Sequence, residues 1–217
     1  RYNQGPIDCV LDIVGKHGVV ADDVKDIKVG VLSAGWNLVA YPEEQKRNPK
    51  SIVDMQFSMP FAASVALLYG RASLPEYNID IARRHEVQDM MSRVTCVKDP
   101  ELDAQFPQHW PAWVEVTTND GNTLRSETVY PKGDPENPLT WYEIKQKFNE
   151  HLEWLRPQDK LRRATVGFES ALNYLENDNT DQLTNFWQQT YKLDEIRNEN
   201  ILEAIPELVE IKNESTK

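Results

Sequence analysis

The start of the chain carries the apolar spacing of an amphipathic helix. After Gly5-Pro6, apolar residues recur at the i, i+3, i+4 and i+7 positions, namely Ile7, Val10, Leu11 and Val14. Proline is tolerated in a first helical turn, and Gly15 or Gly18 offers a place for the helix to end. The pattern therefore predicts a helix over the first fifteen or so residues.

The segment 51–70, SIVDMQFSMPFAASVALLYG, is apolar and rich in alanine. Its length favours a buried helix, which Pro60 should either begin or kink because proline cannot donate a backbone hydrogen bond. Gly70 is suited to cap the end of that helix. A short helix is also predicted over 81–91.

Period-two alternation marks the strands. Ile27, Val29 and Val31 alternate with smaller or polar residues, which predicts a half-buried strand that ends near Gly35. A second strand is predicted over 94–97. The run WVEVTTNDGNTLRSETVY contains two β-rich halves around Asn119-Asp120-Gly121-Asn122, which is the signature of a hairpin. The predicted fold class is α+β, with a small, mainly antiparallel sheet packed with helices.

The stretch YPKGDPENP, residues 130–138, combines three prolines and a glycine with three charged side chains. Thr140 followed by Glu143 matches a capping box, so this bend is interpreted as ending a strand and leading into a helix. The helix carries Trp141, Ile144, Phe148, Leu152 and Leu155. Its amphipathic spacing supports the assignment.

Further helical patterns follow Pro157, at 161–175, 183–191 and 196–205. These segments form an acidic tail in which no chemical motif is recognised. The predicted organisation is an α+β domain over residues 1–156 and an acidic helical tail over 157–217.

The overall charge limits the classes of partner. The chain has 24 basic and 35 acidic residues and a formal net charge of -11, which argues against a nucleic-acid partner. No run reaches the roughly 18 apolar residues of a membrane span, so no membrane association is expected. Cys9 and Cys96 lack a ligand or disulfide spacing, which favours a reducing, cytoplasmic setting. Because the first methionine is Met55, we expect the chain to be part of a longer product.

Standard catalytic signatures are missing from the sequence, including a Walker A loop, GxGxxG, GxSxG and HExxH. The four histidines share no metal-ligand spacing and are interpreted as surface or packing residues: His17, His85, His109 and His151. Neither a bound metal nor a cofactor is expected.

Three stretches in order along the chain nevertheless resemble one family. They are RYNQGPIDCVLDI, VDMQFSMPFAASVALLYGR and VYPKGDPENPLTWYEIKQKF. Together they resemble the carboxy-terminal part of the MmgE/PrpD family, which includes 2-methylcitrate dehydratase and cis-aconitate decarboxylase. The resemblance covers about residues 1–156.

This resemblance implies a division of labour between two parts of an enzyme. In the family, a large helical domain supplies most catalytic groups, and a smaller α+β lid closes over the active site. The chain would then be the lid, inactive by itself, of a lyase that uses acid-base chemistry on a small di- or tricarboxylate. Family members are commonly dimers, so a homodimer is a further possibility.

Four residues are substrate-binding candidates because anionic substrates need cations, amides and hydroxyls in one cleft: Arg1, Gln4, Gln56 and Ser58. Arg1 is a candidate carboxylate ligand, or else a disordered terminal residue. Gln4 either contacts substrate or caps the first helix. Gln56 and Ser58 interrupt an apolar segment, and their expected burial requires hydrogen bonds to substrate or to the fold.

Three other motif residues receive less weight. Phe61 lies where some relatives carry tyrosine, which puts a hydroxyl-mediated role there in doubt. Lys132 and Asp134 belong to the proline-rich bend, and turn formation is favoured over catalysis for both.

The leading hypothesis is a 2-methylcitrate dehydratase-like lid domain or subunit. Two alternatives remain open: a decarboxylase or epimerase of the same family, and a non-catalytic interaction module that binds a partner chain. Helical part and lid could also be separate subunits of one enzyme.

Overall fold

The computed structural model describes residues 1–155. The chain divides into two compact units, Arg1–Pro138 and Leu139–Lys217, and each is described by itself. The predicted helices beyond Pro157 lie outside the described residues. Within the described part, no helix is both long and apolar enough to cross a membrane.

A four-stranded sheet organises the first unit, in the order β2-β1-β3-β4. The strands are β1 (Val24–Val31), β2 (Val94–Lys98), β3 (Ala112–Thr118) and β4 (Thr123–Thr128). β1 runs parallel to β2, whereas the β1–β3 and β3–β4 pairs are antiparallel. The predicted α+β class with a small, mainly antiparallel sheet is confirmed.

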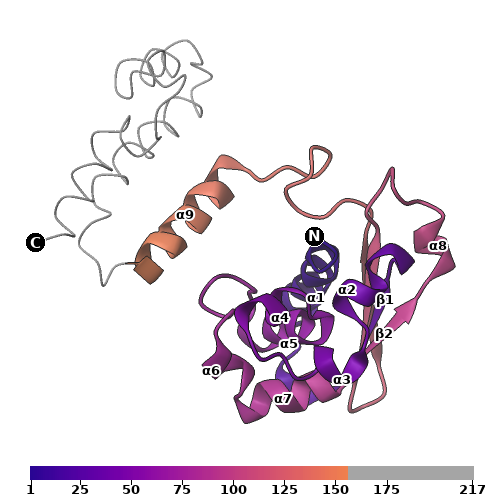
Figure 1. The fold of residues 1–217 in the computed structure, drawn as a ribbon. Helices are drawn as coiled ribbons and strands as arrows, with labels where there is room; N and C mark the ends of the chain where they lie inside the picture. The colour runs from indigo at the N-terminus through magenta and orange to yellow at the C-terminus, as the bar shows by residue number, and fades with distance from the viewer. Residues whose placement is uncertain (156–217) are drawn as a thin grey trace, which may run out of the picture. The chain divides into compact units, whose positions relative to one another are not determined.

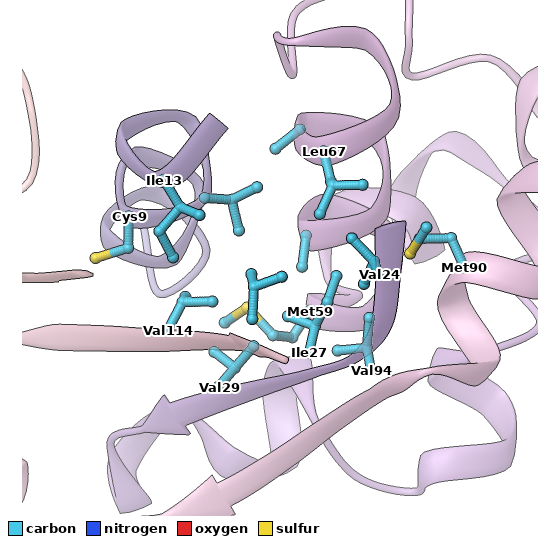
Figure 2. Close-up of a cluster of buried hydrophobic side chains, with 14 of the residues drawn as sticks. Cys9, Ile13, Val24, Ile27, Val29, Met59, Leu67, Met90, Val94 and Val114 are labelled. Carbon is cyan, nitrogen blue, oxygen red and sulfur yellow. The ribbon is translucent and has the colours of Figure 1, made fainter. Parts of the chain in front are cut away.

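Helices cover one face of this sheet (Figure 1). Helix α1 (Gln4–His17) lies against β3 and β4, and α5 (Met59–Tyr69) packs between α1, β2 and α7 (His85–Ser92). Figure 2 shows their apolar side chains meeting those of the strands, with Ile13, Met59 and Val114 among them. Burial of this apolar surface, worth about 25 cal/mol per Å², is the main stabilising contribution to the unit.

The segment 51–70 forms two helices, α4 (Ile52–Gln56) and α5. Pro60 occupies the first turn of α5, and Gly70 ends that helix with a positive φ of 63°. Pro60 therefore begins a helix, which was one of the two expected outcomes. The break before it has a clear cause, since the Ser58 side chain accepts a hydrogen bond from the Phe61 N–H and caps α5.

The single helix predicted over 81–91 is wrong, because the structure has α6 (Ile79–Ala82) and α7 instead. Arg84 between them is extended, with φ -62° and ψ 140°. The Ala82 carbonyl, which a continuous helix would direct to residue 86, accepts a 2.6 Å hydrogen bond from the Gln88 side chain. A side-chain amide thus replaces the backbone donor at the break.

The other face of the sheet is covered in part by a smaller apolar cluster around Leu32, Leu102 and Trp113. Helix α8 (Pro100–Asp103) contributes to it. Short helical turns complete the unit: η1 (Ala21–Asp23), η2 (Ser33–Gly35), α2 (Trp36–Val39) and α3 (Glu43–Lys46).

The described part of the second unit is helix α9 (Trp141–Leu155), preceded by Leu139 and Thr140. The predicted capping box is confirmed in both directions. The Thr140 N–H donates to the Glu143 carboxylate at 2.7 Å, and the Glu143 N–H donates to Thr140 Oγ1 at 3.2 Å. These bonds satisfy backbone donors that have no partner within the helix.

Candidate functional site

Residues from all three family-like stretches meet at the start of α1. Arg1 forms an ion pair with Asp134 of the proline-rich bend. Two residues later, Asn3 Nδ2 donates a 3.0 Å hydrogen bond to the backbone carbonyl of Gln56 at the end of α4. The first stretch thus contacts the third through a side-chain pair and the second through a backbone carbonyl.

The Arg1 guanidinium is held from two directions. Its Nη2 lies 2.7 Å from Asp134 Oδ1 and 2.8 Å from Oδ2, and its central carbon lies 4.6 Å from the centroid of the Trp110 ring. The arginine side chain remains 42% exposed, whereas that of Asp134 is 8% exposed. A buried carboxylate therefore holds a cation that still reaches solvent.

Hydrogen bonds within the proline-rich bend hold the backbone around Asp134. The Gly133 N–H donates to the Asn137 carbonyl at 2.8 Å, and the Asn137 N–H donates to the Asp134 carbonyl at 2.9 Å. The Asn137 side chain adds a 2.9 Å bond to the Tyr130 carbonyl. Gly133 has a φ of 100°, which favours glycine at this position. Residues 130–138 form a turn tied together internally, with one carboxylate directed into the protein.

A second carboxylate ties the bend to α1. Asp8 Oδ2 accepts a 2.7 Å hydrogen bond from the Lys132 N–H. Burial raises the pKa of Asp8, and this backbone hydrogen bond opposes the rise. Asp8 therefore fixes the bend to the first helix.

Asn3 is a residue that the sequence reasoning did not single out. It occupies the N-cap position of α1 but forms no capping hydrogen bond, and it is only 6% exposed. Its Oδ1 is buried without a hydrogen-bond partner among the described residues. Its place inside the stretch RYNQGPIDCVLDI was the available signal, because a polar residue between a candidate cation and a helix start is well placed to bridge segments.

The four predicted substrate-binding residues differ in accessibility. Arg1, Gln4 and Gln56 are exposed, whereas Ser58 is fully buried. The expectation that Gln56 is buried is therefore wrong. It lies in the last turn of the short helix α4, where its backbone carbonyl rather than its side chain joins the fold.

Ser58 has its hydrogen bonds inside the protein. Its hydroxyl donates to the Lys46 carbonyl at 2.5 Å and accepts from the Phe61 N–H at 3.1 Å. Phe61 is itself fully buried and meets Tyr77 edge to face. Gln4 is the first residue of α1 and Asn3 is its N-cap, so Gln4 does not cap the helix.

Among the described residues, no group of three or more His, Cys, Asp or Glu side chains is placed to hold a metal ion. Burial raises the pKa of both Cys9 and Cys96 to about 12, so both thiols stay protonated at neutral pH. His109 stacks edge to face on Tyr130.

A hollow of about 670 Å³ lies beside α4. Its rim carries three exposed apolar side chains, Leu38, Val53 and Phe57, together with charged Lys46 and Lys50. Phe57 directly follows Gln56, so this apolar surface adjoins the segment that Asn3 holds.

Comparison with known proteins shows what the chain is similar to. The family model of the MmgE/PrpD C-terminal domain matches residues 1–169. The 2-methylcitrate dehydratase, mitochondrial, of Yarrowia lipolytica is 22% identical over 157 residues, which covers 68% of this chain and 29% of the relative.

Two further relatives match a similar part of the chain. A cis-aconitate decarboxylase-like protein, oryM, of Aspergillus oryzae is 28% identical over 131 residues, covering 59% of this chain and 25% of the relative. A probable 2-methylcitrate dehydratase of Saccharomyces cerevisiae is 23% identical over 153 residues, covering 64% and 28%. The chain thus spans less than a third of the length of each of these relatives.

Proposed function

Because this chain belongs to the MmgE/PrpD family, as its C-terminal domain, we propose that it is the lid part of a cofactor-free lyase that removes water from a small hydroxy di- or tricarboxylate. The relationship to 2-methylcitrate dehydratases favours dehydration among the reactions considered. The observation that carries the proposal is that all three motif stretches meet at the start of α1, where Arg1 pairs with Asp134, Asn3 holds the Gln56 carbonyl, and the Arg1 cation stays exposed.

The proposed chemistry needs more groups than this site contains. Dehydration requires a base for the proton beside a carboxylate, an acid for the departing hydroxyl, and donors for the substrate carboxylates. Arg1 has the charge and exposure for the last of these tasks, and the start of α1 adds a favourable dipole for an anion. We assign substrate contact to Arg1, Gln4 and Gln56, and we assign Ser58 the task of holding the end of α4 in place.

The catalytic acid and base are proposed to come from a helical part outside residues 1–217. The relatives are more than three times as long as the matched region, which leaves room for such a part. Leu38, Val53 and Phe57 form the surface on which we propose that it docks, because large exposed apolar side chains grouped beside a hollow are typical of interfaces. Contact there would bring a partner next to Gln56.

A second candidate function is decarboxylation within the same family, which the likeness to the cis-aconitate decarboxylase-like protein favours. Both reactions need hydrogen-bond donors for the substrate carboxylates, so the described site does not separate them. An epimerase, or a module that binds a partner chain without catalysis, is a further alternative.

Native and denaturing mass spectrometry of the purified material, followed by a substrate panel, tests the proposal. We expect a second, helix-rich chain to accompany this one. We expect the complex to dehydrate 2-methylcitrate, and citrate, cis-aconitate and iminodisuccinate are the other compounds of the panel. Turnover of cis-aconitate alone would favour decarboxylation. Robust turnover by the isolated chain would contradict the need for a helical part, and tight association without any turnover would favour the interaction module.

A further inference from the structure

The Arg1 guanidinium uses only part of its hydrogen-bonding capacity within the protein. Guanidinium carries five N–H donors in a fixed fork. Both Asp134 oxygens lie within hydrogen-bond distance of the same nitrogen, Nη2. Within residues 1–155, no hydrogen bond engages Nε or Nη1. Nη1 therefore keeps both of its N–H donors for a ligand, and Nε keeps its one.

Trp110 holds the flat side of the same group. Its ring lies 4.6 Å from the guanidinium carbon, and it also contacts two other aromatic rings. Tyr2 is 5.0 Å from it between ring centroids, and Phe106 is 5.1 Å from it in an edge-to-face arrangement. A long side chain that would otherwise sample many rotamers is thus restricted before any ligand arrives.

Asp134 is placed by the bend rather than by its own neighbours in a helix or strand. It is 133 positions from Arg1, and the turn hydrogen bonds of Gly133 and Asn137 hold its backbone on both sides. A change of chain direction does not require a buried carboxylate that pairs with a half-exposed cation. The bend therefore has a role beyond turning the chain.

We infer that Asp134 and Trp110 are positioning residues, which hold Arg1 so that its free Nη1 donors are preset for one carboxylate group of the substrate. This inference rests on the proposed function, in which Arg1 binds a carboxylate. It adds that the proline-rich bend serves the binding site through Arg1 rather than by touching the substrate.

The sign of one effect separates positioning from simple charge. Asp134 is negative, so electrostatics alone predicts that Asp134→Asn strengthens the binding of an anion at Arg1. Positioning predicts the reverse, because the neutral amide binds the guanidinium less firmly and the Nη1 donors lose their orientation. The direction of the change in affinity is therefore informative even when the change is modest.

Citrate binding to the 217-residue chain tests the inference, with a short Gly-Ser extension so that no α-amino charge lies beside Arg1. Titration followed by NMR at constant ionic strength suits the expected dissociation constant of about 1 mM. We expect Arg1→Gln to weaken binding about tenfold and Asp134→Asn about three- to tenfold. The double variant should bind no more weakly than Arg1→Gln, because Asp134 acts through Arg1.

The chain offers a matched control in Arg125, which lies 4.5 Å over the Trp113 ring and pairs with Glu115 at 2.7 Å. Arg125→Gln and Glu115→Gln should leave citrate binding unchanged. Trp110→Phe should retain more affinity than Trp110→Ala, since a ring still supports the guanidinium. Circular dichroism and the NMR spectrum establish that each variant is folded.

Several results would overturn the inference. These are unchanged or tighter citrate binding by Asp134→Asn, additive losses in the double variant, and failure of the wild-type chain to bind citrate, since preset donors on Arg1 need no second chain. The proposed function is judged separately, by turnover of the complex with the accompanying chain. Turnover with normal KM in Arg1→Gln would refute the inferred role of Arg1 while leaving the proposed function intact.

Discussion

The two arginine–tryptophan clusters of the first unit look alike in their contacts and differ in how the chain builds them. Each has a guanidinium over an indole ring, at 4.6 Å for Arg1 and 4.5 Å for Arg125, and each has a carboxylate 2.7 Å away. Glu115 faces Arg125 directly across the β3–β4 ladder. Asp134, by contrast, comes from a bend far along the chain from Arg1.

Burial of the carboxylate separates the clusters further. The Glu115 side chain is 27% exposed and that of Asp134 is 8% exposed. Cross-strand pairs of the first kind arise wherever register places opposite charges together. A buried carboxylate that joins distant segments needs additional structure to hold it, and the hydrogen-bonded bend is that structure. Two arginine–carboxylate pairs with similar distances can therefore contribute differently to the free energy of unfolding.

The largest effect on stability is expected from Gly30→Ala. This substitution tests how firmly the Trp113 ring beneath Arg125 is held in place. A Cβ at Gly30 would lie 2.4 Å from atoms of the Trp113 ring, which is 6% exposed and donates a 2.6 Å hydrogen bond to Asp99. We expect the free energy of unfolding to fall by about 3 kcal/mol, as for overpacked cores. Urea denaturation measures it.

Gly15→Ala is the matched control for that substitution. Gly15 lies inside α1, and a Cβ added there would meet no neighbouring side chain within 4 Å, so alanine should stabilise the helix by about 0.5–1 kcal/mol. A loss below about 1 kcal/mol for Gly30→Ala would mean that Trp113 moves aside easily. The contrast between the two clusters would then be weaker than their burial suggests.

The next effect is the loss of the buried carboxylate in Asp134→Ala. Hydrogen bonds to charged groups contribute about 1.5–3 kcal/mol, and we expect a loss of about 2 kcal/mol because Arg1 keeps partial access to water. Glu115→Ala should lose less than about 1 kcal/mol. Urea denaturation of both variants gives the comparison, and equal losses would contradict it.

Most of the fold of the first unit could be predicted from the sequence, for local reasons. The hairpin turn at Gly121 and the helix start at Pro60 each depend on residues close in sequence, as does the Thr140–Glu143 capping box of the second unit. The break between α6 and α7 was missed because it depends on a particular side-chain bond, from Gln88 to the Ala82 carbonyl.

The site was predictable only in part. Motif wording pointed to Arg1 and Gln56, but the Arg1–Asp134 pair joins residues 133 positions apart, and no periodicity encodes such a contact. Asn3 was missed for the same reason, since its bond to the Gln56 carbonyl spans 53 positions. The assumed burial of Gln56 failed because the break at Ser58 leaves α4 short and its last turn exposed.

Two carboxylates, one near each cluster, should respond oppositely to pH. Burial raises the pKa of Asp8, so the folded state binds its proton more tightly than the unfolded state does, and stability falls as pH rises from the unfolded pKa of about 3.9 through the raised folded value. The hydrogen bond from the Trp113 indole lowers the pKa of Asp99, and the backbone N–H of Glu101 adds to this effect.

Asp99 therefore contributes stability that is present above the unfolded pKa and is lost as pH falls through its lowered folded value. Free energies of unfolding measured between about pH 2.5 and 7 for Asp8→Asn, Asp99→Asn and wild type provide the test. Relative to wild type, Asp8→Asn should gain stability as pH rises and Asp99→Asn should lose it. Parallel pH profiles for the two variants would be inconsistent with this assignment.

The smallest effect on stability is expected at the Arg125 cluster. The salt dependence of its ion pair gives a further comparison with the Arg1 cluster. Arg125→Gln removes the bond to Glu115 and a weaker 3.5 Å contact with Glu127, both between partly exposed side chains. Such pairs contribute about 0.2–1 kcal/mol. At 1 M salt the screening length falls to about 3 Å, so the coupling between Arg125 and Glu115 in a double-mutant cycle should nearly vanish.

The Arg1–Asp134 coupling should largely persist, because the Asp134 carboxylate is shielded from solvent ions. If both couplings disappear together, burial of one carboxylate does not distinguish the clusters, and the bend binds Arg1 no more strongly than Glu115 binds Arg125.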